Sequence, residues 1–464
     1  MARMTSTTEL LPETRRALLH RVATGQVEGR TPSLVGAVMR DGAPVWVRGR
    51  GLVDGQVPDG DTQYRIGSLT KTFVAVLVMR LRDEGLLDLG DPLGEHLPGT
   101  GVGGVTVLHL LSHTSGLASE TPGPWWERTP GELRPQIGDL LGDDPVRHPA
   151  GRRFHYSNPG YALLGALVER LRGDSWHEVL RREVLEPLGM RRTTPSPRAP
   201  HARGWAVHPW ADAVLAEEVQ QTGRMAPAGE LWSTAEDLCR WAAFLLEGDE
   251  RVLAAGTLAE MREPATCQAE DAGRYAYGLG LESFRAGGRL LYGHGGSMPG
   301  FLASLRVCLD AGLAGIVLAN ATSGPAAGAI AADLIEIVDE REPRIPEPWA
   351  PLPDVEHDLL ALTGLWHWGT TSYGLRLTGE GGLELTPLSA GGSGRGSRFR
   401  ARGDGTWIGL DNYYTGEVLR VVRAADGTVS HLDLGSFVLT REPYHPADVV
   451  PGGVDPQGWH GQPR

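Results

Sequence analysis

The stretch Ser68-Leu69-Thr70-Lys71 places a hydroxyl and an amine three residues apart. In a helix this spacing puts both side chains on one face, within hydrogen-bond reach of each other. Apolar residues then recur at helical intervals up to about Gly85, namely Phe73, Val74, Leu77, Val78 and Leu81. We therefore predict a mostly buried helix with Ser68 at its N-terminus.

Lys71 is the only lysine among the 44 lysine and arginine residues of the chain. At an exposed site either cation serves, but a guanidinium with a pKa above about 12 cannot replace an ammonium that must lose its proton. The positive end of the helix dipole and burial both favour an alkoxide at Ser68 and proton transfer by Lys71. The pair is thus predicted to be a nucleophile and its base.

Tyr156-Ser157-Asn158 forms a second polar motif, on a loop just before an apolar helix that runs from Tyr161 to Leu171. A phenol close to an ammonium is expected to have a lowered pKa. We therefore predict that Tyr156 serves as a base toward Ser68 and as an acid toward the leaving group.

His294-Gly295-Gly296-Ser297 forms a third motif, at the end of a predicted strand. Its glycines allow a substrate backbone to approach the sheet edge. We predict an oxyanion hole made of the backbone N–H groups of Ser68 and Ser297, each donor contributing about 3 kcal/mol. Gly295 and Gly296 are predicted to line the substrate site.

The chain reads as two domains joined by a linker. Residues 33–39 and 43–47 are predicted strands, and so are 289–294, 301–309 and 313–320, followed by a helix over 325–340. These elements indicate an α/β domain over 1–342, in which an antiparallel sheet is flanked by helices and accompanied by a helical lobe. A Pro-rich linker spans 343–356, and short alternating runs over 357–464 predict a small antiparallel β-barrel.

Composition excludes several partners and sites. A net charge of -13 disfavours nucleic acid and anionic membranes. We find no apolar membrane span or signal-peptide core, so we expect a cytoplasmic protein. Neither a disulfide framework nor a thiolate metal site is expected from Cys239, Cys267 and Cys308, and His109, His113, His148 and His155 are interpreted as structural or solvated. No metal and no organic cofactor is implied.

These three motifs, in this order, resemble the serine β-lactamase and D,D-peptidase superfamily, specifically its class C-like branch. Residues 105–117 and 185–190 also look like the helical lobe of this branch. The resemblance implies that Ser68 is the nucleophile, Lys71 and Tyr156 transfer protons, and Asn158 contacts the substrate amide and the lysine. His294 stands where β-lactamases carry Lys-Thr-Gly, which argues against strong β-lactam hydrolysis.

Within the branch, the chain most resembles penicillin-binding-protein-type thioesterases, which release and cyclise nonribosomal peptides. The C-terminal barrel resembles their lipocalin-like domain, and the loop around Trp125 and Trp126 resembles their entry loop, although the two tryptophans would serve equally well as anchors of that loop. Arg441 is placed to hold a substrate carbonyl or carboxylate, with a surface ion pair as the alternative.

Three functions stay open at this point. The first is a stand-alone thioesterase that takes a peptide from its carrier as an acyl-Ser68 ester and lets the peptide's own amine attack. The second is a D,D-carboxypeptidase, D-aminopeptidase, carboxylesterase or weak β-lactamase that uses water. The third is a binding protein that has kept the fold. Oligomeric state is not encoded in any pattern that we recognise.

Overall fold

The computed structural model describes residues 9–267, 275–346, 348–379, 381–388 and 395–445. The chain divides into two compact units, Met1–Arg344 and Ile345–Arg464. Between Arg341 and His357, the described residues form neither helix nor strand. The predicted linker over 343–356 falls within this stretch.

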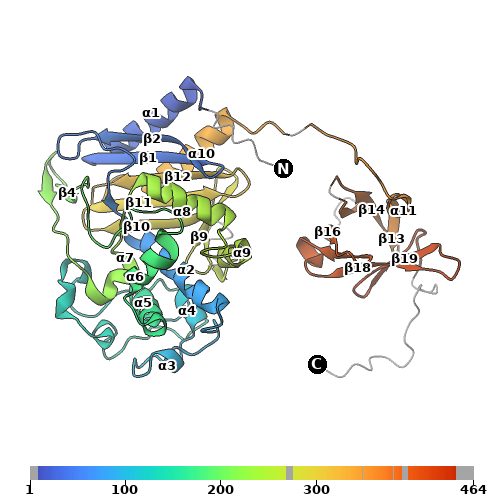
Figure 1. The fold of residues 1–464 in the computed structure, drawn as a ribbon, viewed down its shortest axis with the longest axis horizontal. Helices are drawn as coiled ribbons and strands as arrows, with labels where there is room; N and C mark the ends of the chain where they lie inside the picture. Colours follow the sequence, from blue (N-terminus) through green and yellow to red (C-terminus); the bar gives the residue numbers. More distant parts are fainter. Residues whose placement is uncertain (1–8, 268–274, 347, 380, 389–394, 446–464) are drawn as a thin grey trace. The chain divides into compact units, whose positions relative to one another are not determined.

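The first unit is built on one eight-stranded sheet in which every neighbouring pair is antiparallel (Figure 1). In spatial order its strands are β2 (Ala43–Gly51), β1 (Ser33–Arg40), β12 (Leu313–Ala319), β11 (Phe301–Cys308), β10 (Arg289–Met298), β9 (Glu282–Ala286), β8 (Tyr275–Tyr277) and β7 (Thr266–Cys267). The predicted antiparallel sheet is therefore confirmed.

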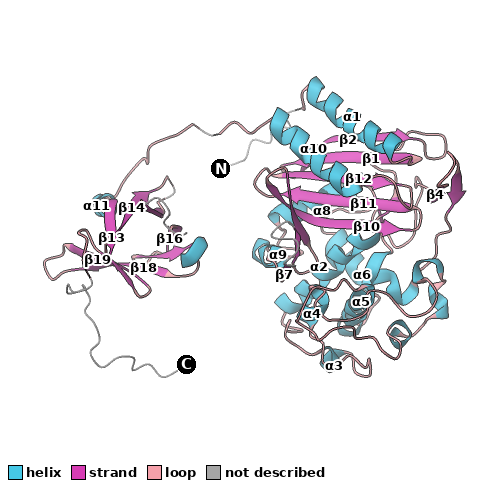
Figure 2. Cartoon of the chain, turned by 180° about the vertical axis from the view of Figure 1, so that it is seen from behind, coloured by secondary structure: helices cyan, strands magenta, loops and turns pink. Residues whose placement is uncertain are grey.

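Helices cover both faces of this sheet (Figure 2). On one face lie α1 (Pro12–Glu28) and α10 (Ala327–Arg341), which bury Leu34 and Val38 of β1. Val35 and Ala37 point to the other face, against a core that includes α8 (Ala235–Glu247) and the helical lobe. This alternation follows from the two-residue period of a strand.

The helical lobe contains α2 (Thr70–Asp83), α3 (Leu93–His96), α4 (Val107–Leu111), α5 (Asn158–Arg172), α6 (Trp176–Leu180), α7 (Ala226–Gly229) and α9 (Ala255–Arg262). Two short ribbons complete the unit: β3 (Tyr64–Arg65) with β6 (Trp232–Ser233), and β4 (Trp205–Val207) with β5 (Val214–Ala216). Helix α2 is apolar on nearly all sides because it is surrounded by other elements, as the sequence predicts.

The second unit is a short helix, α11 (His357–Leu362), and an eight-stranded antiparallel meander. Its strands are β13 (Gly364–Trp368), β14 (Thr371–Leu377), β15 (Leu383–Pro387), β16 (Ser397–Ala401), β17 (Thr406–Gly409), β18 (Val418–Arg423), β19 (Val429–Leu434) and β20 (Phe437–Leu439). Backbone hydrogen bonds in both directions between His367 and Thr440 join the two ends of the meander. The predicted barrel is thus confirmed.

None of the helices in the described ranges is long and apolar enough to span a bilayer.

Candidate active site

Ser68 lies in a 3-10 turn, Gly67–Leu69, which leads directly into α2. Two glycines let this turn approach β10. A Cβ on Gly67, whose φ is +53°, would lie 2.5 Å from the backbone nitrogen of Ser297. A Cβ on Gly296 would lie 1.9 Å from the carbonyl oxygen of Ile66. The serine is therefore held against the sheet by contacts that only glycine permits.

Lys71 is fully buried and makes hydrogen bonds to three oxygens. Its Nζ donates to Ser68 Oγ at 3.0 Å, to Asn158 Oδ1 at 2.7 Å and to the Ala228 carbonyl at 2.7 Å. Burial lowers the pKa of Lys71 to about 7, although the carboxylate of Glu120 opposes this shift. At neutral pH a large fraction of Lys71 is thus an uncharged amine that can accept the proton of Ser68.

Tyr156 lies beside this pair, with the Lys71 Nζ 4.9 Å from the centroid of its ring. Burial raises the pKa of Tyr156 well above 10, and a hydrogen bond with Ser68 opposes the shift only in part. The prediction of a lowered phenol pKa is therefore wrong. Burial raises the pKa of Tyr156, and Lys71, which is partly uncharged at neutral pH, does not offset this effect. Tyr156 is suited to donate a proton rather than to act as the base.

Asn158 is the first residue of α5 and connects Lys71 to an acidic loop. Its Nδ2 donates to Glu120 Oε1 at 2.8 Å, while Glu120 Oε2 accepts from the indole of Trp126 at 2.7 Å. Ser157 caps α5 by accepting from the Gly160 amide at 3.2 Å, and its own N–H donates to His113 Nδ1 at 3.0 Å. These contacts fix the loop that carries Tyr156.

His294 is buried and lies in the interior of β10. The strand continues to Met298, whereas the sequence predicts that it ends at the histidine. The strand extends because Pro299 and Gly300 form a two-residue turn that pairs Met298 with Phe301. His294 Nδ1 bonds to the Gly295 carbonyl, and Nε2 lies 3.1 Å from the hydroxyl of Tyr277. Burial lowers the pKa of His294 below its usual value, with Glu282 opposing, so the ring is neutral at pH 7.

The register of β10 and β11 directs one amide of the strand toward the nucleophile. The pair Met298–Phe301 closes the hairpin and is hydrogen-bonded, so the next pair, Ser297–Leu302, is not. The Ser297 N–H therefore points away from β11, on the side where the Gly295 N–H meets Glu282 at 3.2 Å. This geometry fits the predicted oxyanion hole of Ser68 and Ser297.

A cavity of about 410 Å³ brings most of the predicted site residues together. It is lined by Ser68, Tyr156, Glu282, His294, Gly295, Gly296, Ser297, Leu302, Ala303, Pro325, Ala327 and Gly328. Lys71 and Asn158 join the site through the hydrogen bonds to Ser68 and to each other.

Trp125 and Trp126 differ in their surroundings. Trp126 is 6% exposed and anchored by Glu120, whereas Trp125 is 53% exposed and stacks under the guanidinium of Arg128, 4.4 Å from its ring centroid. The anchoring alternative describes Trp126, and Trp125 is the more exposed of the two rings.

Arg441 lies in the second unit and bonds to the end of α11. It donates to the carbonyls of Thr363 and Leu365 at 3.0 Å each and to that of Ala361, and its guanidinium stands 4.0 Å from the ring centroid of Trp366. These contacts differ from the surface ion pair considered above. They give Arg441 a structural role within its own unit, and substrate contact stays a prediction.

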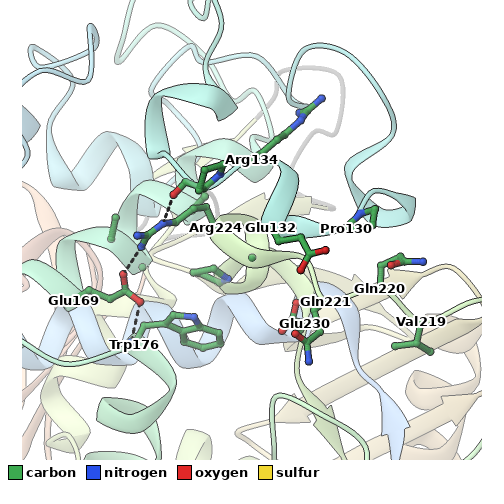
Figure 3. Close-up of a pocket in the computed structure, with 17 residues that line it drawn as sticks. Pro130, Glu132, Arg134, Glu169, Trp176, Val219, Gln220, Gln221, Arg224 and Glu230 are labelled. Carbon is green, nitrogen blue, oxygen red and sulfur yellow. Dashed lines mark hydrogen bonds and ion pairs between the residues drawn. The ribbon is translucent and has the colours of Figure 1, made fainter.

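A larger cavity, of about 700 Å³, lies in the helical lobe (Figure 3). It is bounded by residues of 130–135, α5, 219–224 and α7. Its charges are largely satisfied, since Arg224 pairs with Glu169 at 2.8 Å and Glu169 also accepts from the Trp176 amide. None of the predicted site residues lines it.

Sequence reasoning missed several residues of the site, chiefly Glu120, Tyr277, Glu282 and Arg306. Glu120 stands in a loop without periodicity, and Glu282 and Arg306 come from strands whose pairing with β10 no local pattern reveals. His113 was interpreted as structural, and it does support the Tyr156 loop. Across the described residues, no group of His, Cys, Asp and Glu is arranged to hold a metal ion.

The sheet, the lobe and the buried serine–lysine–tyrosine cluster define an active-serine acyl-transfer fold. The chain belongs to the Beta-lactamase family, whose model matches residues 17–340. Members of this family are serine hydrolases. Residues 355–441 match a second family, described only as a domain of unknown function, DUF7586. The lipocalin-like assignment of the barrel therefore stays a prediction.

Known relatives agree that the chain belongs to the Beta-lactamase family. Penicillin-binding protein 4 of Amycolatopsis lactamdurans is 30% identical over 311 residues, which cover 63% of this chain and 80% of that protein. The match to Beta-lactamase-like protein 2 of Dictyostelium discoideum spans only 43% of that relative's length.

Two solved structures extend the comparison. A D-stereospecific amidohydrolase from Streptomyces sp. aligns with a TM-score of 0.59 and 27% identity over 71% of this chain and 99% of its own. SurE aligns with a TM-score of 0.56 and 27% identity over 93% of this chain and 99% of its own. The second alignment extends into the barrel unit.

Proposed function

We propose that this protein is a serine acyl-transfer enzyme that works through an acyl-Ser68 ester. The observation that carries the proposal is the 3.0 Å hydrogen bond between Ser68 and a buried lysine with a pKa of about 7. In acylation, neutral Lys71 takes the proton of Ser68 while Oγ attacks the substrate carbonyl. The amides of Ser68 and Ser297 stabilise the resulting oxyanion.

The tetrahedral intermediate then collapses with loss of the leaving group. Tyr156 donates its proton to that group and is reprotonated by the Lys71 ammonium, so the proton first taken from Ser68 leaves with the product. Asn158 holds Lys71 in place by accepting from its Nζ, while its own side-chain amide donates to Glu120. An incoming amine or water reverses these steps and releases the acyl group.

The finer proposal is that the acyl donor is a carrier-bound nonribosomal peptidyl thioester with a D-residue at its acyl end, and that the peptide's own amine is the acceptor. In support of this proposal, SurE aligns over 93% of this chain and has also been solved with D-Leu. The exposed indole of Trp125 offers a surface on which a peptide can stack. A carrier-bound peptide is a cytoplasmic substrate, so the proposal places the enzyme there.

The competing proposal is hydrolysis by a D,D-carboxypeptidase, D-aminopeptidase, carboxylesterase or weak β-lactamase. It is supported by the likeness to a D-stereospecific amidohydrolase and to a penicillin-binding protein.

A product analysis separates the two proposals. The enzyme and its Ser68→Ala variant are incubated with a linear peptidyl thioester that ends in a D-residue, and products are followed by mass spectrometry. A Ser68-dependent cyclic product, lighter than the linear acid by one water, supports the cyclase. Linear acid alone supports the hydrolase, and equal turnover by Ser68→Ala removes both.

A further inference from the structure

His113 forms hydrogen bonds with the two residues that flank Tyr156 in the chain. The backbone N–H of His155 donates to the carbonyl oxygen of His113 at 2.7 Å, and that of Ser157 donates to its Nδ1 at 3.0 Å. His113 follows α4, which packs beside α5 in the helical lobe (Figure 1). The segment that carries the phenol is therefore held on both sides by one residue from another part of the chain.

The imidazole ring of His113 also packs against the ring of Tyr156. Their centroids lie 4.1 Å apart, with an angle of 33° between the two planes. Three further rings surround the imidazole, with centroids at 5.8, 5.0 and 4.8 Å, namely those of Phe154, Tyr161 and Tyr277. Because His113 is fully buried, this packing restricts the phenol ring as well as its backbone.

The same contacts fix the protonation state of His113. Because Nδ1 accepts the N–H of Ser157, the proton of the neutral ring is on Nε2. Burial lowers the pKa of His113 well below its usual value, and the charge of Lys71 acts in the same direction. The Nδ1 acceptor is therefore available throughout the neutral pH range.

This arrangement costs stability at His113 in two ways. Its φ of +55° lies in the left-handed region, which costs a residue other than glycine about 1–2 kcal/mol. Its buried Nε2 has no hydrogen-bond partner within the described part of the chain, which costs about 1–3 kcal/mol more. Since strained residues cluster at active sites, the cost indicates a role in the site rather than in the stability of the lobe.

We propose that His113 is a positioning residue for Tyr156, and that it aligns the phenol hydroxyl for protonation of the leaving group. The inference rests on the proposed function, in which the leaving atom gains the phenol proton and the phenolate regains one from the Lys71 ammonium. His113 is not among the described residues that line the catalytic cavity, so it acts through Tyr156 rather than on the substrate.

Two esters of N-acetyl-D-alanine test this role, because they differ only in the leaving group. The p-nitrophenyl ester loses a stable anion that needs no proton, whereas the methyl ester must be protonated as it loses methanol. For each ester, kcat/KM of the full-length enzyme reports the acylation of Ser68.

His113→Phe keeps a ring against Tyr156 but offers Ser157 no acceptor. We expect this variant to lower kcat/KM about a hundredfold for the methyl ester and no more than about threefold for the p-nitrophenyl ester. An equal loss on both esters, or no loss on the methyl ester, would overturn the inference.

His113→Asn provides a second variant, should His113→Phe fail to fold. Asparagine tolerates a positive φ, and its Oδ1 takes the place of the histidine Nδ1, so only the ring contact is lost. This variant should lower kcat/KM for the methyl ester about tenfold and spare the p-nitrophenyl ester. A loss that does not depend on the leaving group would again refute the role of His113.

The matched control is His109→Phe. Nδ1 of His109 also accepts a backbone N–H, that of Thr106 at 3.3 Å, and this bond is part of the cap of α4. His109→Phe therefore removes the same kind of hydrogen bond without removing either of the two that hold Tyr156. Its kcat/KM should stay within about threefold of the wild type for both esters. A loss confined to the methyl ester in this control would contradict the assignment to His113.

A double-mutant cycle separates positioning from a general structural effect. If His113 acts through Tyr156, adding His113→Asn to Tyr156→Phe should change kcat/KM for the methyl ester by no more than about threefold. A further loss of about tenfold would show that His113 supports another part of the site, which would refute the inference. Failure of the proposed function is a different outcome: Ser68→Ala would turn over both esters as fast as the wild type, or Tyr156→Phe would keep full activity on the methyl ester.

Discussion

Lys71 and Tyr156 are 4.9 Å apart, measured from Nζ to the ring centroid, and burial moves their pKa values in opposite directions. The pKa of Lys71 falls to about 7, whereas that of Tyr156 rises well above 10. Since a base must be unprotonated at the working pH, the lysine fits this role and the phenol does not. The chemistry at Ser68 therefore depends as much on the burial of the site, which sets these pKa values, as on the identity of its residues.

Lys71→Arg is predicted to reduce the acylation rate by at least about a thousandfold. A guanidinium stays charged at neutral pH, and the fully buried position offers it no water. Single-turnover kinetics with a chromogenic ester would measure the loss. Activity within a few-fold of the wild type would remove Lys71 from the mechanism.

The acylation rate should depend on pH through the same lysine. Below a pH of about 7 Lys71 is protonated, so kcat/KM should fall about tenfold per pH unit on the acid side and level off above it. Because Glu120 raises the pKa of Lys71, Glu120→Gln should move this limb to lower pH. If the acid side of the kcat/KM profile of Glu120→Gln moved to higher pH, or did not move, this electrostatic account would be contradicted.

Residue identities at the site were readable from the sequence where type and spacing alone restrict the chemistry. Ser68 and Lys71 share a helix turn, and a lone lysine among arginines stands out. Glu120 and Arg306 cannot be recognised as site residues in this way. They join the site through contacts with Asn158 and Glu282, respectively, which are distant in the sequence. Protonation states were equally hidden, since burial is a property of the folded molecule.

At the scale of elements, the site depends on the close approach of the 3-10 turn Gly67–Leu69 to β10. Gly67→Ala should lower kcat/KM by about a hundredfold or more, because the added methyl would clash with the Ser297 backbone and displace the oxyanion donors. Steady-state kinetics on a folded variant would show this.

Gly85→Ala provides the matched control for this substitution. Gly85 also has a positive φ, +73°, but a Cβ there meets nothing within 4 Å. It should lose about 1 kcal/mol of stability from backbone strain and keep its activity. If both variants lose activity equally, the clash with β10 is not the cause.

Elements with strong periodicity were predictable. The runs that became β11, β12 and helix α10 were placed within a few residues, since the two strands are nearly continuous buried runs and α10 buries one apolar face. The end of β10 was misplaced because its glycines look like a loop, although pairing with β11 makes them strand. In the barrel, the sequence predicts short alternating strands over 357–464 without fixing where each one ends. For example, the turn that separates β19 from β20 is only two residues long and includes Gly435.

At the scale of the whole molecule, the two units match two different families. That the barrel contacts the substrate is a prediction, and Arg441 is the barrel residue through which it can be tested. Arg441→Ala removes three hydrogen bonds to the carbonyls of Ala361, Thr363 and Leu365, where α11 leads into β13, and the stacking on Trp366. It should therefore destabilise the second unit by about 1–3 kcal/mol.

Differential scanning calorimetry of the full chain would record this change as a lower transition temperature for the barrel. A changed KM or cyclic-to-linear product ratio, with the thermal transition unaltered, would instead assign Arg441 to the substrate. An unaltered transition with unaltered kinetics would contradict both roles.

The most direct test of the account is the intact mass of the enzyme during turnover of a D-configured peptidyl thioester, followed by peptide mapping. The account predicts a transient adduct of the acyl mass on Ser68, absent in Ser68→Ala and strongly delayed in Lys71→Arg. Turnover without any adduct, or an adduct on another residue, would contradict it.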